Sequence, residues 1–100
     1  MTNRIELAGV ITQGPIRKQS PAGIPHCHFV LEHRSDQQEA GLPRQVYCRL
    51  PVVVSGQGSQ LNTQHLALGS NIKVSGFLAY QTGRNGVGKL VLHAEKIIDI

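Results

Sequence analysis

A strand-like alternation of apolar and polar side chains runs through residues 26–34, whose sequence is HCHFVLEHR. Cys27, Phe29 and Leu31 share one parity, and most of the residues between them are polar. Because successive side chains of a strand point to opposite faces, this pattern predicts a strand with one buried face. Residues 44–54, RQVYCRLPVVV, repeat the alternation and predict a second strand of the same kind.

Three further stretches show the same period: residues 4–12, 70–80 and 89–100. Helical spacing is almost absent, and turn residues separate the stretches, with Asn85-Gly86 favouring a hairpin before the last one. Composition predicts a loop from Gly14 to Pro25, which includes Lys18, and another over residues 35–43. Five such strands in a chain of 100 residues must curl, because an open sheet would leave a face and two edges exposed. The predicted fold class is all-β. We expect a single five-stranded antiparallel OB-fold barrel over residues 1–100, with at most a short helical turn near Leu61 to Leu68.

The composition excludes several classes of protein. Lys and Arg total 10 and Asp and Glu total 6, so the net charge of +4 comes from scarce acids rather than abundant lysines. An apolar fraction of 40% argues against a wholly disordered chain. Cys27 and Cys48 are too few for a disulfide framework, and no apolar run approaches the roughly 18 residues of a membrane span. We therefore expect a cytoplasmic protein with no membrane partner.

Enzyme and metal chemistry find little support in the motifs. The run GRNGVGK at residues 83–89 matches most of a phosphate-binding loop, but Leu90 stands where a hydroxyl must bind magnesium. Zinc requires four converging ligands, and the candidate residues lack that spacing. These residues are His26, Cys27, His28, His33, Cys48 and His93. No G-x-S-x-G motif or suggestive pair of carboxylates occurs, so we expect no enzyme, no catalytic residue, no metal and no other cofactor.

The basic residues gather where an OB barrel binds oligonucleotides, which is the face of strands two and three with the loops joining strands 1–2 and 4–5. The residues placed there are Lys18, Arg34, Arg44, Arg84 and Lys89. Tyr47 lies on the outward face of the third predicted strand, where its ring could stack on a base. Composition and placement alone leave an equally good alternative, which is a solvated barrel surface with ordinary cations.

Several runs of sequence resemble the bacterial primosomal replication protein N family, the PriB family. They are SPAGIPHC at 20–27, FVLEHR at 29–34, QEAG at 38–41, MTNR at 1–4, VSG at 54–56, NG at 85–86 and VLHAE at 91–95. The run LGSNIKVSG at 68–76 is more distantly similar to bacterial single-strand DNA-binding proteins. The resemblance covers essentially the whole chain. It implies an OB-fold homodimer that binds single-stranded DNA, stabilises the restart helicase on DNA, and helps hand over to the next primosomal protein, a loader protein, leading to reloading of the replicative helicase.

The resemblance also implies which residues contact DNA. Where this sequence matches the family, they are Lys18, Arg34, Arg44 and Lys89, with Arg84 conservatively placed in the last hairpin. Three positions depart from the family: Tyr47 replaces a tryptophan, Leu42 an aromatic residue and Thr82 a basic one. Fewer cations and weaker stacking predict looser DNA binding. Protein partnership would then carry more of the function, and the alternative is mainly a protein-docking adaptor.

Overall fold

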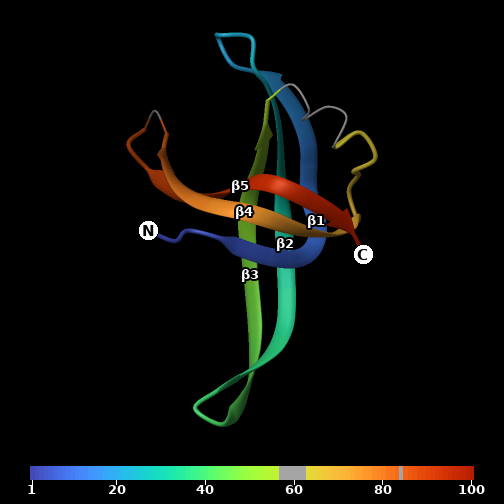
Figure 1. Cartoon of the computed structure of the whole chain (residues 1–100), viewed down its shortest axis with the longest axis vertical. Helices are drawn as coiled ribbons and strands as arrows, with labels where there is room; N and C mark the ends of the chain where they lie inside the picture. Colours follow the sequence, from blue (N-terminus) through green and yellow to red (C-terminus); the bar gives the residue numbers. More distant parts are fainter. Residues whose placement is uncertain (57–62, 84) are drawn as a thin grey trace.

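The computed structural model describes residues 1–56, 63–83 and 85–100. Its strands are β1 (Ile5–Gln19), β2 (Pro25–Glu39), β3 (Leu42–Ser55), β4 (Asn71–Thr82) and β5 (Gly88–Asp99). They form a closed barrel in the order β1-β2-β3-β5-β4, with β4 returning to β1 (Figure 1). The predicted all-β, five-stranded barrel is confirmed. The expectation of a purely antiparallel sheet is wrong at one seam, because β3 and β5 pair in parallel.

The barrel interior is filled by the apolar parity that the sequence predicts. On β2, Cys27, Phe29 and Leu31 are buried, and they meet buried residues from the other strands. Ile72 and Leu92 from β4 and β5 are completely inaccessible to solvent. Each fully buried aliphatic side chain of this size contributes about 1.5–3 kcal/mol through removal of apolar surface from water. This core holds the strands whose outward faces form the site described below.

The first strand serves two neighbours because it bends. Its beginning, Ile5–Val10, pairs with β4, and the register to β2 shifts twice between Ile11 and Ile16, where Gly14-Pro15 has a cis peptide bond. Pairing resumes at Ile16, opposite His28, and continues to Gln19. The predicted loop from Gly14 onward is therefore wrong until Ser20. The Gly-Pro pair bends the strand without ending it, since bulges let a barrel strand turn a corner.

The β2–β3 hairpin extends beyond the barrel, as the long arm in the lower half of Figure 1 shows. The strands stay paired from His26 opposite Ser55 to Glu39 opposite Leu42. Ala40 and Gly41 form the turn with φ values of 55° and 77°, as a two-residue hairpin turn of type I′ requires. The predicted loop over residues 35–43 is thus wrong apart from this turn.

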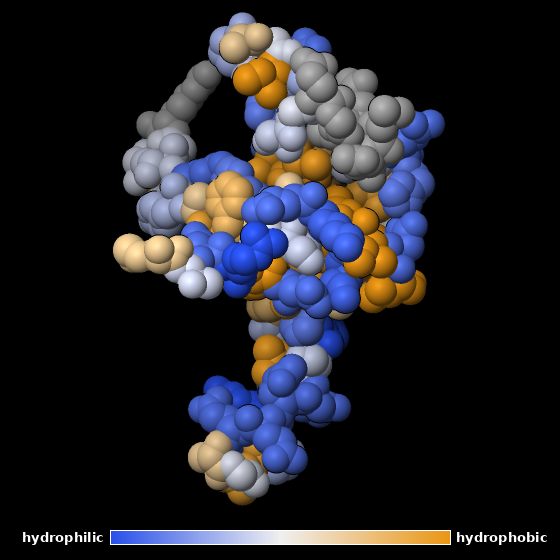
Figure 2. Space-filling model, in the orientation of Figure 1, coloured by the Kyte–Doolittle hydropathy of each residue, from blue (hydrophilic) through white to orange (hydrophobic). Residues whose placement is uncertain are grey.

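The arm's polarity misled the sequence interpretation. Figure 2 shows that the projecting part of the molecule is mostly hydrophilic. Outside the barrel both faces of a hairpin meet water, so polar side chains on both faces do not prevent strand pairing. Composition therefore could not distinguish this arm from a loop.

Hydrogen bonds from His33 tie the base of the arm to the barrel. Its Nδ1–H donates to the Ala8 carbonyl oxygen of β1 at 2.7 Å. In the neutral ring Nε2 then accepts from the Ser35 hydroxyl, also at 2.7 Å. This link joins β1 to β2 at the base of the arm.

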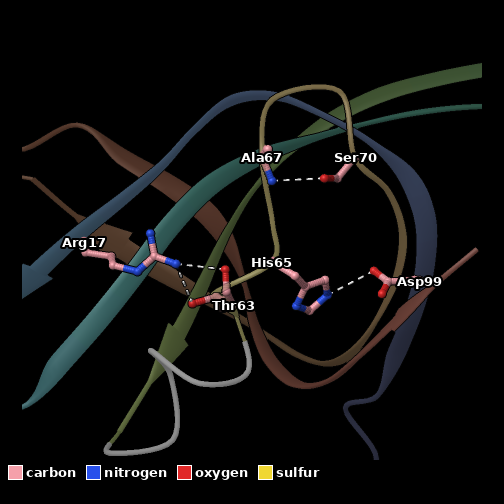
Figure 3. A network of polar contacts seen from close by, with 6 residues as sticks. All are labelled: Arg17, Thr63, His65, Ala67, Ser70 and Asp99. Carbon is pink, nitrogen blue, oxygen red and sulfur yellow. Dashed lines mark hydrogen bonds and ion pairs between the residues drawn. The ribbon is translucent and has the colours of Figure 1, made fainter.

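Polar contacts hold residues 63–70, which precede β4, against the barrel, and several of them are drawn in Figure 3. The Arg17 guanidinium donates to the Thr63 carbonyl oxygen at 2.8 Å and to its hydroxyl at 3.4 Å, and His65 lies 3.0 Å from the Asp99 carboxylate. The Leu66 amide donates to the Thr63 carbonyl, which closes a single turn. Leu61, where the predicted helical turn begins, lies outside the described residues.

Candidate nucleic-acid interface

An open groove of about 240 Å³ lies where β1, β2 and β5 approach one another. Lys18 of β1, His28 of β2 and Lys89 of β5 line it, together with Gln81 of β4. Lys18 was expected in a loop, but it belongs to the paired end of β1, opposite His26. The buried apolar residues Phe29, Val52 and Val91 also line the groove. The fold thus brings together two of the predicted site cations that are far apart in the sequence.

Among the described residues, the side chains that line the groove include two lysines and no carboxylate. Within the described part of the chain, no ion pair joins Lys18 or Lys89 to an acid. Loss of water on burial lowers the pKa of His28, and the charges of Lys18, His26 and Lys89 lower it further. These effects favour the neutral form of His28, and Lys18 and Lys89 line the groove without an ion-pair partner in the described chain.

A second cluster lies on the arm, where Arg34 and Tyr47 are cross-strand partners. The Arg34 guanidinium carbon is 4.6 Å from the centre of the Tyr47 ring, which is cation–π geometry. Glu32 holds both, because its carboxylate lies 3.3 Å from Arg34 Nη2 and accepts from the Tyr47 hydroxyl at 3.4 Å. Tyr47 remains 51% exposed, so the ring keeps accessible surface on which a base could stack.

Arg44 does not join this cluster. It pairs with Gln37 and therefore shares the strand face of Val46 rather than that of Tyr47. Its Nε lies 3.5 Å from the Glu39 carboxylate. The structure brings Arg34 and Tyr47 together and leaves Arg44 on the other face of the arm. Arg84, the remaining predicted contact, lies outside the described residues.

Sequence reasoning missed His28 and Gln81 as groove-lining residues and gave Arg49 no role. Arg49 lies opposite Glu32 on the outward face of β3, between the groove and Tyr47. A usable indication was present for His28, because it shares its parity with Arg34 in the alternating stretch. Strand parity already placed His28 on the outward face with Arg34, but no binding role was assigned to it.

Other chemistry is not organised in the described structure. Among residues 1–56, 63–83 and 85–100, no group of three or more His, Cys, Asp or Glu side chains is arranged to hold a metal ion. The run that resembles a phosphate-binding loop leads into strand β5 at Gly88, as predicted, and not into a helix. Over the same ranges, no helix is long and apolar enough to cross a membrane.

Comparison with known proteins decides the family. Residues 3–96 match the model described as "Another single-strand binding protein family". The chain is 73% identical, over the full length of both sequences, to the replication restart protein PriB of Vibrio vulnificus. This chain belongs to the PriB family. The resemblance stated from the sequence is thereby confirmed.

Further PriB relatives and solved structures agree with this assignment. The PriB of Vibrio cholerae is 69% identical over 100% of both chains. The structure of PriB from Ralstonia solanacearum has a TM-score of 0.80 at 23% identity and covers 100% of each chain. The single-stranded DNA-binding protein of Thermus aquaticus also has a TM-score of 0.80 at 23% identity, over 99% of this chain and 50% of that one. These structural likenesses confirm the predicted OB fold.

Proposed function

We propose that this protein binds single-stranded DNA as an accessory factor of replication restart, along a path from the barrel groove to the projecting arm. The observation that carries the proposal is the groove itself, where Lys18 and Lys89 converge with no carboxylate paired to either in the described chain. Membership of the PriB family supports the biological setting.

The proposed path combines two kinds of contact. Lys18 and Lys89 neutralise backbone phosphates, and Arg34 adds a third cation beside the Tyr47 ring. Cation contacts release counterions, while an aromatic ring stacks on any base, so affinity depends on salt and hardly on sequence. Arg44 and Arg84 remain proposed phosphate contacts. Arg44 would contact the DNA from the other face of the arm.

Fluorescence polarisation of a labelled oligo-dT over a salt series tests this proposal. The logarithm of the association constant should fall linearly with the logarithm of salt concentration, by about 0.7 per phosphate neutralised on a single strand. An affinity that does not change with salt would refute the phosphate mechanism.

The finer role in the primosome is also a proposal. We infer that the protein stabilises the restart helicase on DNA, helps hand over to the next primosomal protein, the loader protein, and acts as a cytoplasmic homodimer. Two copies of a chain with net charge +4 carry +8, which strengthens attraction to DNA. Helicase assays on forked DNA with and without the protein test the role, and sedimentation measures the oligomer. An unchanged helicase rate would refute the stabilising role.

A second candidate, a protein-docking adaptor with weak DNA binding, is favoured by features of the arm. Arg34 and Arg44 each lie beside a carboxylate, and Leu42 next to the turn is 66% exposed. Carboxylates compete with phosphate for the arginines, and an exposed leucine suits a protein contact. The adaptor predicts negligible oligo-dT binding at physiological salt together with clear helicase stimulation, whereas the DNA-binding proposal predicts both.

A further inference from the structure

One titratable side chain, His28, lines the groove together with Lys18 and Lys89. His28 projects from β2, with Ile16 of β1 as its cross-strand neighbour on one side and Val53 of β3 on the other. It lines the same groove as Lys18 and Lys89, and its ring centre is 6.1 Å from that of His26. An imidazolium in this position could reach the same phosphates that the lysines attract.

We infer that His28 is a third phosphate-binding group of the groove, and that it takes up a proton from solvent when single-stranded DNA binds. The inference rests on the proposed function and adds to it a residue and a linked proton. In the free protein His28 is neutral and adds no positive charge to the groove. A bound phosphate makes the imidazolium favourable, and the ring then donates a charge-assisted hydrogen bond to it.

The surrounding charges explain the direction of this change. The charged groups facing His28 are Lys18 from β1, His26 from its own strand and Lys89 from β5, while its β3 partner Val53 and the groove-lining Pro51 carry no charge. Partial desolvation and these neighbouring charges act in the same direction, so the pKa of His28 lies below its ordinary value. A phosphate diester at Lys18 and Lys89 cancels their repulsion and raises that pKa.

The linkage has a definite sign. If DNA binding raises the pKa, the complex holds more protons than the free protein, and affinity must increase as pH falls. As pH falls, DNA affinity starts to increase near the pKa of His28 in the complex. It stops increasing below the pKa of His28 in the free protein. A difference of one pKa unit corresponds to tenfold in affinity, and we expect about three- to tenfold between about pH 8 and about pH 5.5.

The test compares oligo-dT affinity over this pH range, at fixed ionic strength, for the wild type, His28→Gln and His26→Gln. Glutamine keeps a polar side chain but cannot take up a proton. His26→Gln is the control for a neighbouring imidazole: His26 lies on the same strand, with its Nδ1 2.8 Å from the Ser55 hydroxyl, and does not line the groove. Because the charge of His26 lowers the pKa of His28, its loss should shift the gain in affinity to higher pH without abolishing it. We expect oligo-dT affinity to increase at low pH in the wild type and in His26→Gln, and to change little between about pH 8 and about pH 5.5 in His28→Gln.

A second measurement follows the proton directly. The pKa of the His28 ring, read from its NMR signals, should rise when oligo-dT is added, and calorimetry in two buffers of different ionisation enthalpy should show net proton uptake. Binding that gains nothing at low pH, or a gain that persists in His28→Gln, would overturn the inference and leave the proposed function standing. An absence of oligo-dT binding at every pH would overturn both.

Discussion

The barrel groove and the projecting arm present positive charge in two different ways. In the groove, Lys18 and Lys89 have no paired carboxylate within the described chain, and buried apolar residues form part of the wall. On the arm, Glu32 accompanies Arg34 and Tyr47. The groove is therefore open to phosphate, while the arm holds its arginine and tyrosine in position at the cost of partial neutralisation. One end of this surface therefore attracts phosphate, while the other end fixes the orientation of Arg34 and Tyr47.

The two regions also differ in what supports them. The groove walls are the barrel strands, whose inner faces pack in the core, whereas the outer arm has no core beneath it. Substitutions in the core should therefore destabilise the fold and thereby disturb the groove. Changes on the arm should act on binding with little effect on stability.

The largest expected effect is the loss of stability from a substitution in the barrel core, compared with one at the tip of the arm. Leu31→Ala removes a side chain that is completely buried and should lower the free energy of unfolding by about 2–5 kcal/mol. Leu42→Ala, at an exposed position beside the turn, should change it by no more than about 0.5 kcal/mol. Urea denaturation measures both. Similar losses in the two variants would show that the tip belongs to the cooperative core.

Removing the aromatic ring of the arm should give the next largest effect. Tyr47→Ala should weaken oligo-dT binding by about 1–3 kcal/mol, because a stacked base loses its platform. Tyr47→Phe is the control, since it keeps the ring and loses only the hydroxyl contact to Glu32. Fluorescence polarisation should find the phenylalanine variant close to the wild type. Equal losses in both variants would assign the effect to the hydroxyl rather than to stacking.

Removing a groove lysine should be recognised by a change in the salt dependence of oligo-dT affinity, because that slope counts phosphate contacts. Lys89→Ala should reduce the slope of log affinity against log salt by about 0.7, the value for one phosphate contact on a single strand. Lys96 is the matched control because it is exposed on the same strand but does not line the groove. A slope that is unchanged by Lys89→Ala would remove Lys89 from the phosphate path.

The smallest expected effect is an increase in oligo-dT affinity rather than a loss. Glu32→Gln keeps the size of the side chain but frees Arg34 from its ion pair, so oligo-dT affinity should rise by less than about 1 kcal/mol. Glu95→Gln, which separates the exposed pair with Arg4, should leave DNA binding unchanged. Weaker binding in Glu32→Gln would show that orienting Arg34 and Tyr47 matters more than the competing charge.

The sequence predicted the fold well where one face of a strand is buried. The alternation of Cys27, Phe29 and Leu31 placed β2, and the confirmed core follows from it. Prediction failed where burial does not impose alternation, as on the arm, where polar residues on both faces looked like a loop. It also failed at Gly14-Pro15, because a bulged strand and a turn use the same residues.

The candidate site was partly predictable for the same reason. The sequence placed Lys18 and Lys89 near one surface, and the barrel brings them into one groove. Parity along β3 already separated Arg44 from Tyr47, but the position of Glu32 beside Arg34 depends on side-chain geometry. His28 was overlooked because a neutral histidine adds nothing to a count of charges, although its strand position was predictable.

We propose that the groove and the arm form one continuous path for single-stranded DNA. Mapping backbone amide shifts by NMR during titration with oligo-dT tests it most directly. We predict shifts that follow Lys18, His28, Arg34, Tyr47 and Lys89 and leave the β1–β4 seam near Leu7 and Val74 unchanged. Shifts confined to that seam, with none at the groove or the arm, would contradict the account.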